Sequence, residues 1–126
     1  MNLDTAVRYS LWLSAPLNVI VGFGFADPSG WVGSLIGLPT QTHPFFAWFG
    51  GAMVAIFGFV YAWLALQPTI LKPMLFVGAS GKLAAVAICV ALYAQGQLSG
   101  VTTLIISGDL FFVVLWAGYL ILNKSR

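Results

Sequence analysis

The fold class follows from stretches such as residues 74–93, which read MLFVGASGKLAAVAICVALY. The only charged side chain in this segment is Lys82. Since an α-helix rises about 1.5 Å per residue, about 20 residues are enough to cross the roughly 30 Å hydrocarbon core of a bilayer. The segment therefore predicts a transmembrane helix.

Similar apolar segments occur at residues 7–26, 45–66 and 101–122. Backbone amides in lipid have no water to bond with, so each segment is expected to satisfy them internally, as a helix. The alternating pattern of lipid-facing β-strands is absent from the sequence. We therefore predict an all-α integral membrane protein, a four-helix bundle that forms one domain over residues 1–126.

The composition supports a membrane environment and excludes several other functions. Hydrophobic residues make up 60% of the chain and charged residues 6%, against roughly 25% charged residues in soluble domains. Five basic side chains and a net charge of +2 are too few to neutralise a nucleic acid backbone. One cysteine, one histidine and three acidic residues make a metal centre unexpected, and no cofactor is predicted. His43 is interpreted as a polar boundary residue.

The segments between the spans contain turn residues. The connections at residues 67–73 and 95–100 are short, which predicts that the second and third spans, and the third and fourth, are antiparallel neighbours. Trp31 to Leu38 is apolar but too short to span the bilayer. We predict a short interfacial helix there, capped by Ser29 and ending near Pro39.

Basic residues indicate an orientation. The two ends of the chain and the second connection contain Arg8, Lys72, Lys124 and Arg126. The other two connections contain no lysine or arginine. By the positive-inside rule both termini are expected in the cytoplasm, with the protein in the cell (inner) membrane. Aromatic residues near the cytoplasmic face, among them Tyr61 and Trp116, are expected to form an interfacial belt.

Three polar residues are expected near the bilayer midplane. Lys82 lies about ten residues into the third span, roughly 15 Å deep, and Asp109 and Asn18 reach a similar depth. Because a charge at the helix centre costs about 2.5 to 3.5 kcal/mol on insertion scales, we expect Lys82 and Asp109 to pair. Helical side chains lean toward their own N-terminus, which pulls these two apart, so a bridging water or Asn18 is expected to complete the contact.

Small and polar residues are predicted to support this centre. Ser10, Ser14, Asn18 and Gly22 recur every four residues and share one face of the first span, which is expected to point inward. Ser80 and Ser107, with neighbouring glycines, are expected to permit close approach of the third and fourth spans. In the second span, contacts with other helices are predicted at small residues in a spacing of four: Gly51 with Ala55, and Gly58 with Ala62.

Two interpretations of the Lys82 and Asp109 pair stay open at this stage. The pair could be a structural device that fixes helix register. Ionisable residues inside a membrane more often mark a binding site or an ion pathway, and we favour that interpretation.

The motifs Gly81-Lys82 and Gly108-Asp109-Leu110, with four spans in this length, resemble small bacterial inner-membrane proteins of the broad DoxX-like kind. The resemblance covers the whole chain in architecture and rests in motif on those five residues. It implies a membrane partner of quinone-linked redox systems, or a binder of a lipophilic small molecule. It does not imply an enzyme acting alone, and it assigns no catalytic residue.

The favoured hypothesis is a non-catalytic multi-pass protein, either an accessory subunit of a redox-linked membrane complex or a binder of a quinone or lipid. The alternative is a small oligomeric transporter in which Lys82 or Asp109 is the coupling group. A redox partner that handles quinone is a third hypothesis. The expected partners are the lipid bilayer and further copies of the chain or other membrane subunits, not nucleic acid.

Overall fold

A computed structural model describes residues 2–123 of the chain and is helical throughout, apart from turns and connections. The helices are α1 Leu3–Ala26, α2 Trp31–Ile36, α3 Pro44–Leu66, α4 Lys72–Ala94, α5 Gly100–Ser107 and α6 Asp109–Leu122. Four helical segments, with α5 and α6 together forming the last, are long and apolar enough to cross a membrane. The prediction of an all-α four-helix bundle is confirmed, and the four apolar helices support a multi-pass membrane protein. Lys124 and Arg126, which entered the argument on orientation, lie outside the described residues.

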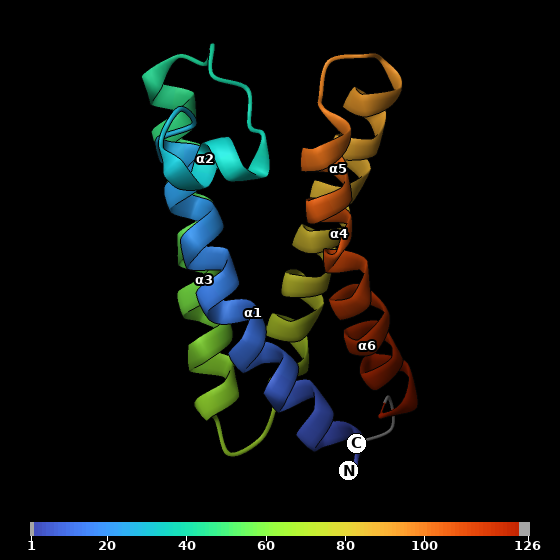
Figure 1. The fold of residues 1–126 in the computed structure, drawn as a ribbon. Coiled ribbons are helices and arrows are strands. Elements are labelled where there is room, and N and C mark those ends of the chain that lie inside the picture. Colours follow the sequence, from blue (N-terminus) through green and yellow to red (C-terminus); the bar gives the residue numbers. More distant parts are fainter. Residues whose placement is uncertain (1, 124–126) are drawn as a thin grey trace.

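The helices form two halves that diverge (Figure 1). One half is α1 with α3, and the other is α4 with α5 and α6. The halves meet at the end of the bundle that carries both chain termini and separate toward the end that carries α2, as Figure 1 shows. The second and third spans, α3 and α4, are antiparallel, as predicted. The prediction that they are also close neighbours is wrong over most of their length. The connection between them fixes their spacing only at one end.

Glycines hold α1 against α3. A Cβ added at Gly51 would lie 2.5 Å from the Gly22 carbonyl oxygen, and one at Gly58 would lie 2.7 Å from the Ala15 carbonyl oxygen. Both distances are shorter than any side chain tolerates, so the two backbones touch at these points. The predicted helix contacts at Gly51 and Gly58 are confirmed, and their partner is the inward face of α1.

The end of the bundle near the termini is densely packed. Its buried apolar side chains come from all four spans and from the connection between α3 and α4: Val7, Leu11, Ala15, Tyr61, Leu64, Ala65, Ile70, Leu75, Ala79, Phe112, Trp116 and Tyr119. Arg8 closes the same end, because its guanidinium donates to the carbonyl oxygens of Ala65 (3.0 Å), Gln67 (2.6 Å) and Pro68 (2.9 Å). These carbonyls at the end of α3 have no helical partner, and a basic side chain is the favoured group there.

The short helix α2 is present and begins at Trp31 as predicted, but its predicted cap and its predicted end were wrong. Gly30, not Ser29, is the N-cap, and the helix ends at Ile36 with Gly37 in the left-handed conformation at φ +83°. Ser29 instead belongs to the turn that follows α1, in which the Gly30 amide donates to the Asp27 carbonyl oxygen (3.0 Å). A glycine is needed at the end of α2 because other residues adopt this backbone conformation only with strain.

The sequence predicts one regular helix over residues 101–122, but the fourth span is not regular. It is interrupted at Gly108, whose amide donates to the Ile105 carbonyl oxygen (3.2 Å), three residues back instead of four. The Phe111 amide likewise donates to the Gly108 carbonyl oxygen (3.2 Å). The helix is therefore tightened locally just before Asp109, the first residue of α6.

Candidate functional site

An ion pair joins the third and fourth spans inside the bundle. Lys82 Nζ lies 2.9 Å from Asp109 Oδ1 and 3.2 Å from Asn18 Oδ1. The three polar residues predicted to meet do meet, and the contact between the charges is direct. Of the two groups expected to complete the contact, a water or Asn18, Asn18 does so. Lys82 and Asp109 also meet directly, because the long flexible lysine stem spans the offset between the two backbones.

Asn18 connects this pair to the other half of the bundle. Its amide nitrogen donates to the Val54 carbonyl oxygen of α3 at 3.1 Å, while its oxygen accepts from Lys82. The bond to Val54 fixes the orientation of the amide, so the oxygen faces the ammonium. Residues from α1, α4 and α6 therefore converge on one point, with the backbone of α3 behind them.

Three aromatic rings surround the Lys82 ammonium. Nζ lies 4.8 Å from the ring centroid of Phe112, 5.2 Å from that of Tyr61 and 5.7 Å from that of Trp116. Ring faces attract a cation most strongly where water is excluded. Tyr61 and Trp116, at 2% and 0% exposed, are core residues, so their assignment to an interfacial belt was wrong. Gly78 makes room for them, since a Cβ there would lie 2.8 Å from the Tyr61 ring.

The position of these rings around Lys82 was not predicted, although the sequence contains a pattern that indicates it for two of them. Phe112 and Trp116 follow Asp109 by three and seven residues, which puts all three on one face of α6. Tyr61 on α3 carries no comparable signal, because only the packing of the two halves brings it to Lys82.

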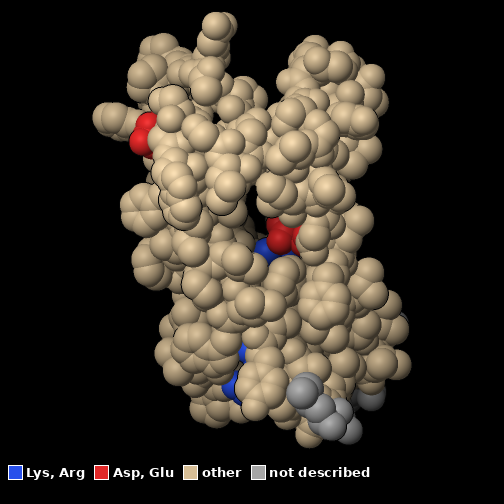
Figure 2. Space-filling model, in the orientation of Figure 1, with Lys and Arg blue, Asp and Glu red and all other residues tan. Residues whose placement is uncertain are grey.

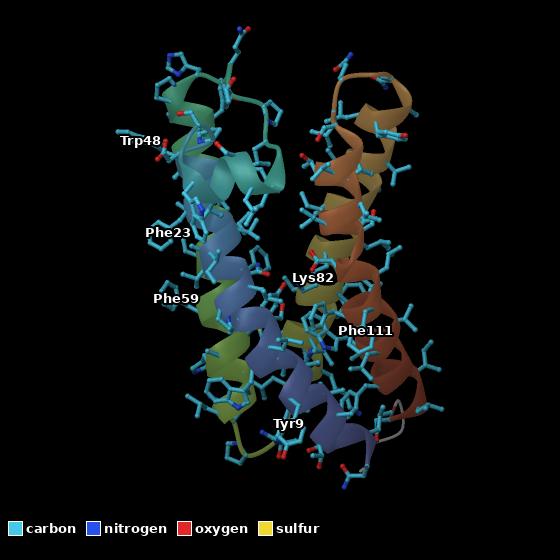
Figure 3. The ribbon with its side chains drawn as sticks, in the orientation of Figure 1. Tyr9, Phe23, Trp48, Phe59, Lys82 and Phe111 are labelled. Carbon is cyan, nitrogen blue, oxygen red and sulfur yellow. The ribbon has the colours of Figure 1, made fainter. Side chains whose placement is uncertain are left out.

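A cavity of about 630 Å³ leads to the ion pair from the end of the bundle that carries α2. Its wall is mainly apolar and includes Leu17, Val21, Phe25, Leu38, Phe46, Met53, Phe57, Ala85, Ile88, Cys89, Leu92 and Ile106. Asn18, Lys82 and Asp109 line its inner end. Figure 2 shows the molecule hollowed between its two halves, with acidic and basic atoms at the floor, and Figure 3 shows Lys82 between the halves. The volume falls within the roughly 300 to 1,000 Å³ of small-molecule sites.

A second contact joins the two halves beyond the cavity. The Thr102 hydroxyl of α5 lies 2.9 Å from the Ile36 carbonyl oxygen and 2.7 Å from that of Gly37, at the end of α2. The Ser99 hydroxyl lies 3.4 Å from the same Gly37 oxygen. The halves are therefore linked at both ends of the cavity, by the hydrogen bond from Lys82 to Asn18 at its inner end and by the α2–α5 contact at its outer end.

The serines predicted to support the centre have different positions. Ser14 is fully buried on the inward face of α1, and its hydroxyl has no hydrogen-bond partner among the described residues. Ser80 is exposed, because it precedes Lys82 by two residues and so points about 200° away around the helix. Ser107 is half-buried, and neither Ser80 nor Ser107 lines the cavity.

Residues 2–123 contain no group of three potential metal ligands. His43 is the N-cap of α3, where its Nδ1 accepts a hydrogen bond from the Phe45 amide at 3.1 Å. Comparison of the chain with protein-family models, curated protein sequences and solved structures gave no match.

Proposed function

We propose that this protein is a non-catalytic multi-pass membrane protein that binds a lipophilic small molecule of the quinone or lipid class. The observation that carries the proposal is an apolar cavity that ends at the Lys82, Asp109 and Asn18 cluster. Apolar walls with a few convergent polar groups are the usual composition of a small-molecule site.

The wall of the cavity is apolar and its inner end is polar, and this difference suggests which ligands would bind. A ligand that arrives from lipid gains little by exchanging lipid tails for an apolar wall, since both surroundings are equally apolar. The polar end of the ligand then decides the affinity, because a hydrogen bond is electrostatically stronger in a low-dielectric site than in water. The ion pair is the polar group that a ligand seated in this cavity would meet.

The shape of the cavity favours binding from the membrane. The hollow in Figure 2 lies on the side of the bundle, between α1 and the α5–α6 segment, where lipid tails would surround the protein. Large apolar side chains such as Phe23, Trp48 and Phe59 point outward in Figure 3 and are more than half exposed. A lipophile could therefore reach the ion pair without passing through water.

The alternative proposal is a small oligomeric transporter, and one observation favours it. The backbone is interrupted at Gly108 beside Asp109, and transporters often bind substrate or ions where a spanning helix is broken. Against it, the packed side chains between the ion pair and the termini, such as Leu11, Leu64 and Trp116, would have to separate to let a substrate pass. Proton-coupled flux into liposomes that contain the purified protein would favour the transporter.

Within this proposal the protein is an accessory subunit of the inner membrane, with cytoplasmic termini, beside further copies or other membrane subunits of a redox-linked complex. Its many exposed apolar side chains are compatible with cover by lipid or by such a partner. A pull-down from native membranes with protein and lipid mass spectrometry would identify the partner.

The binding proposal is tested by filling the cavity. Ala85 lines the cavity, whereas its neighbour Ala84 is exposed and does not. We expect Ala85→Phe to abolish binding of para-octylphenol to protein in lipid nanodiscs, because the new ring occupies the space above Lys82. Ala84→Phe is the matched control and should bind as the wild type does. Equal binding by both variants would place the ligand outside this cavity and overturn the proposal.

A further inference from the structure

The hydrogen-bonding capacity left open in the cavity indicates which ligands it accepts. The Lys82 ammonium donates to Asn18 and Asp109, faces three aromatic rings and has a side chain only 3% exposed. A ligand cannot approach it closely without displacing one of these partners. The Asp109 carboxylate, whose side chain is 30% exposed, is therefore more accessible to a ligand than the Lys82 ammonium.

The other donors around the floor are also occupied. The Asn18 amide donates to the Val54 carbonyl oxygen. The Tyr61 hydroxyl is buried and directed at the Gly78 carbonyl oxygen, at 3.5 Å. The Thr102 hydroxyl, at the far end of the cavity, is held by the α2 carbonyls.

Asp109 differs from these groups. One carboxylate oxygen, Oδ1, accepts from Lys82, and within residues 2–123 no group donates to the other, Oδ2. The side chain is 30% exposed and lines the cavity. A carboxylate has acceptor sites on both oxygens and no donor. The floor of the cavity therefore presents an unused, negatively charged acceptor.

We infer that the ligand is an uncharged lipophile whose polar end carries a hydrogen-bond donor, such as an alcohol, phenol or quinol hydroxyl, donated to Asp109 Oδ2. This inference rests on the proposed function and specifies its ligand class. Fatty-acid and phosphate anions are disfavoured because they would meet a carboxylate of like charge. A cationic head is disfavoured as well, because Lys82 already neutralises Asp109 and a second buried charge would be uncompensated.

The two redox forms of a quinone should therefore bind with different affinities. A quinol carries hydroxyl donors, whereas an oxidised quinone carries only acceptors and has no group to donate to Asp109 Oδ2. A hydrogen bond to a charged group corresponds to a difference of roughly ten- to a hundredfold in affinity. We expect the reduced form to bind more tightly by about this factor.

The test compares para-octylphenol with its methyl ether, which keeps the ring and tail but has no donor. Binding to protein in lipid nanodiscs is measured by calorimetry, and we expect the phenol to bind roughly ten- to a hundredfold more tightly than the ether. Octanoate, the anionic probe, should bind more weakly than the phenol. Equal affinities of phenol and ether, with both lost in Ala85→Phe, would overturn this inference and leave the cavity proposal standing.

The role of Asp109 is tested in the Lys82→Met/Asp109→Leu double variant, which removes both charges together. In this variant the phenol should bind no more tightly than the ether, because the Asp109 carboxylate that accepts its hydrogen bond is gone. Asp109→Asn is the second variant: its amide can donate to the ether oxygen, so the preference should narrow while the side-chain volume is kept. A phenol preference that persists unchanged in both variants would assign the acceptor to another group and overturn the inference.

Discussion

The two sides of α3 show how one helix can make both a tight interface and a cavity. Toward α1 it presents Gly51 and Gly58, and the backbones touch. Toward α4 it presents Phe57 and Tyr61, whose rings line the cavity. The interface with α1 is close because its residues are small, and α4 is held away because the intervening residues are large. In lipid, where apolar surface alone does not drive helices together, side-chain size decides which helices pack.

The largest effect is expected from breaking the ion pair between α4 and α6 at the floor of the cavity, whose lysine also bonds Asn18 of the other half. Removing one partner of a buried pair costs about 3 to 5 kcal/mol, because the other charge is left uncompensated. Asp109→Leu should cost more than Lys82→Met, since it leaves the Lys82 ammonium, 3% exposed, without a counter-ion. In Lys82→Met the remaining carboxylate is 30% exposed to the cavity. Thermal unfolding in mild detergent measures both.

The double variant is the control for this prediction. Lys82→Met with Asp109→Leu removes both charges, so it should be more stable than Asp109→Leu alone. Strictly additive losses in the cycle would mean that the two side chains do not interact energetically, contrary to their 2.9 Å contact.

An intermediate effect is expected at the interface of α1 with α3. Gly51→Ala would place a Cβ 2.5 Å from the Gly22 carbonyl oxygen, and overpacking of this kind typically costs about 1 to 3 kcal/mol. The adjacent Gly50 lines the cavity, and a Cβ there would meet nothing within 4 Å. Gly50→Ala should therefore leave the unfolding temperature unchanged or raise it slightly, because alanine favours a helix. Equal losses in both variants would contradict the close packing of α1 on α3.

The smallest effect is expected at the α2–α5 contact. Thr102→Val removes the hydroxyl that bonds the end of α2, which should cost about 1 kcal/mol of stability and widen the outer end of the cavity. Thr103→Val is the matched control, because that hydroxyl bonds only the Ser99 carbonyl oxygen one turn back (3.0 Å). Spin labels at Ser34 and Gln97 would measure the separation. A distance that is unchanged in Thr102→Val would show that the contact does not hold the halves together.

Much of this architecture could be predicted because membrane insertion constrains sequence strongly. The four spans follow from length and hydropathy, and the contact between Lys82 and Asp109 follows from the cost of an isolated charge. The glycine contacts at Gly51 and Gly58 follow from their spacing. Each of these features depends on one segment or on a pair of adjacent spans.

Features that depend on how the two halves pack could not be predicted. The position of Tyr61 against Lys82 is set by the separation of α3 from α4, which the short connection between them does not determine. Ser80 was expected inside the bundle because its neighbours are small, although its angle from Lys82 on the helix already points it outward. The interruption at Gly108 was missed because glycine is common in membrane spans and most glycines there do not break the helix.

The position of the ion pair also bears on how the chain enters the membrane. Lys82 and Asp109 belong to consecutive spans joined by the short turn after Ala94, so the charge on α4 is matched as soon as α6 enters the bilayer. Until then α4 carries an intramembrane charge that costs about 2.5 to 3.5 kcal/mol on insertion scales. We therefore expect α4 and the α5–α6 segment to insert together during synthesis, as a helical hairpin in which Asp109 compensates the charge of Lys82. Asn18 belongs to α1, which is synthesised earlier, so the site is complete once the hairpin packs against α1.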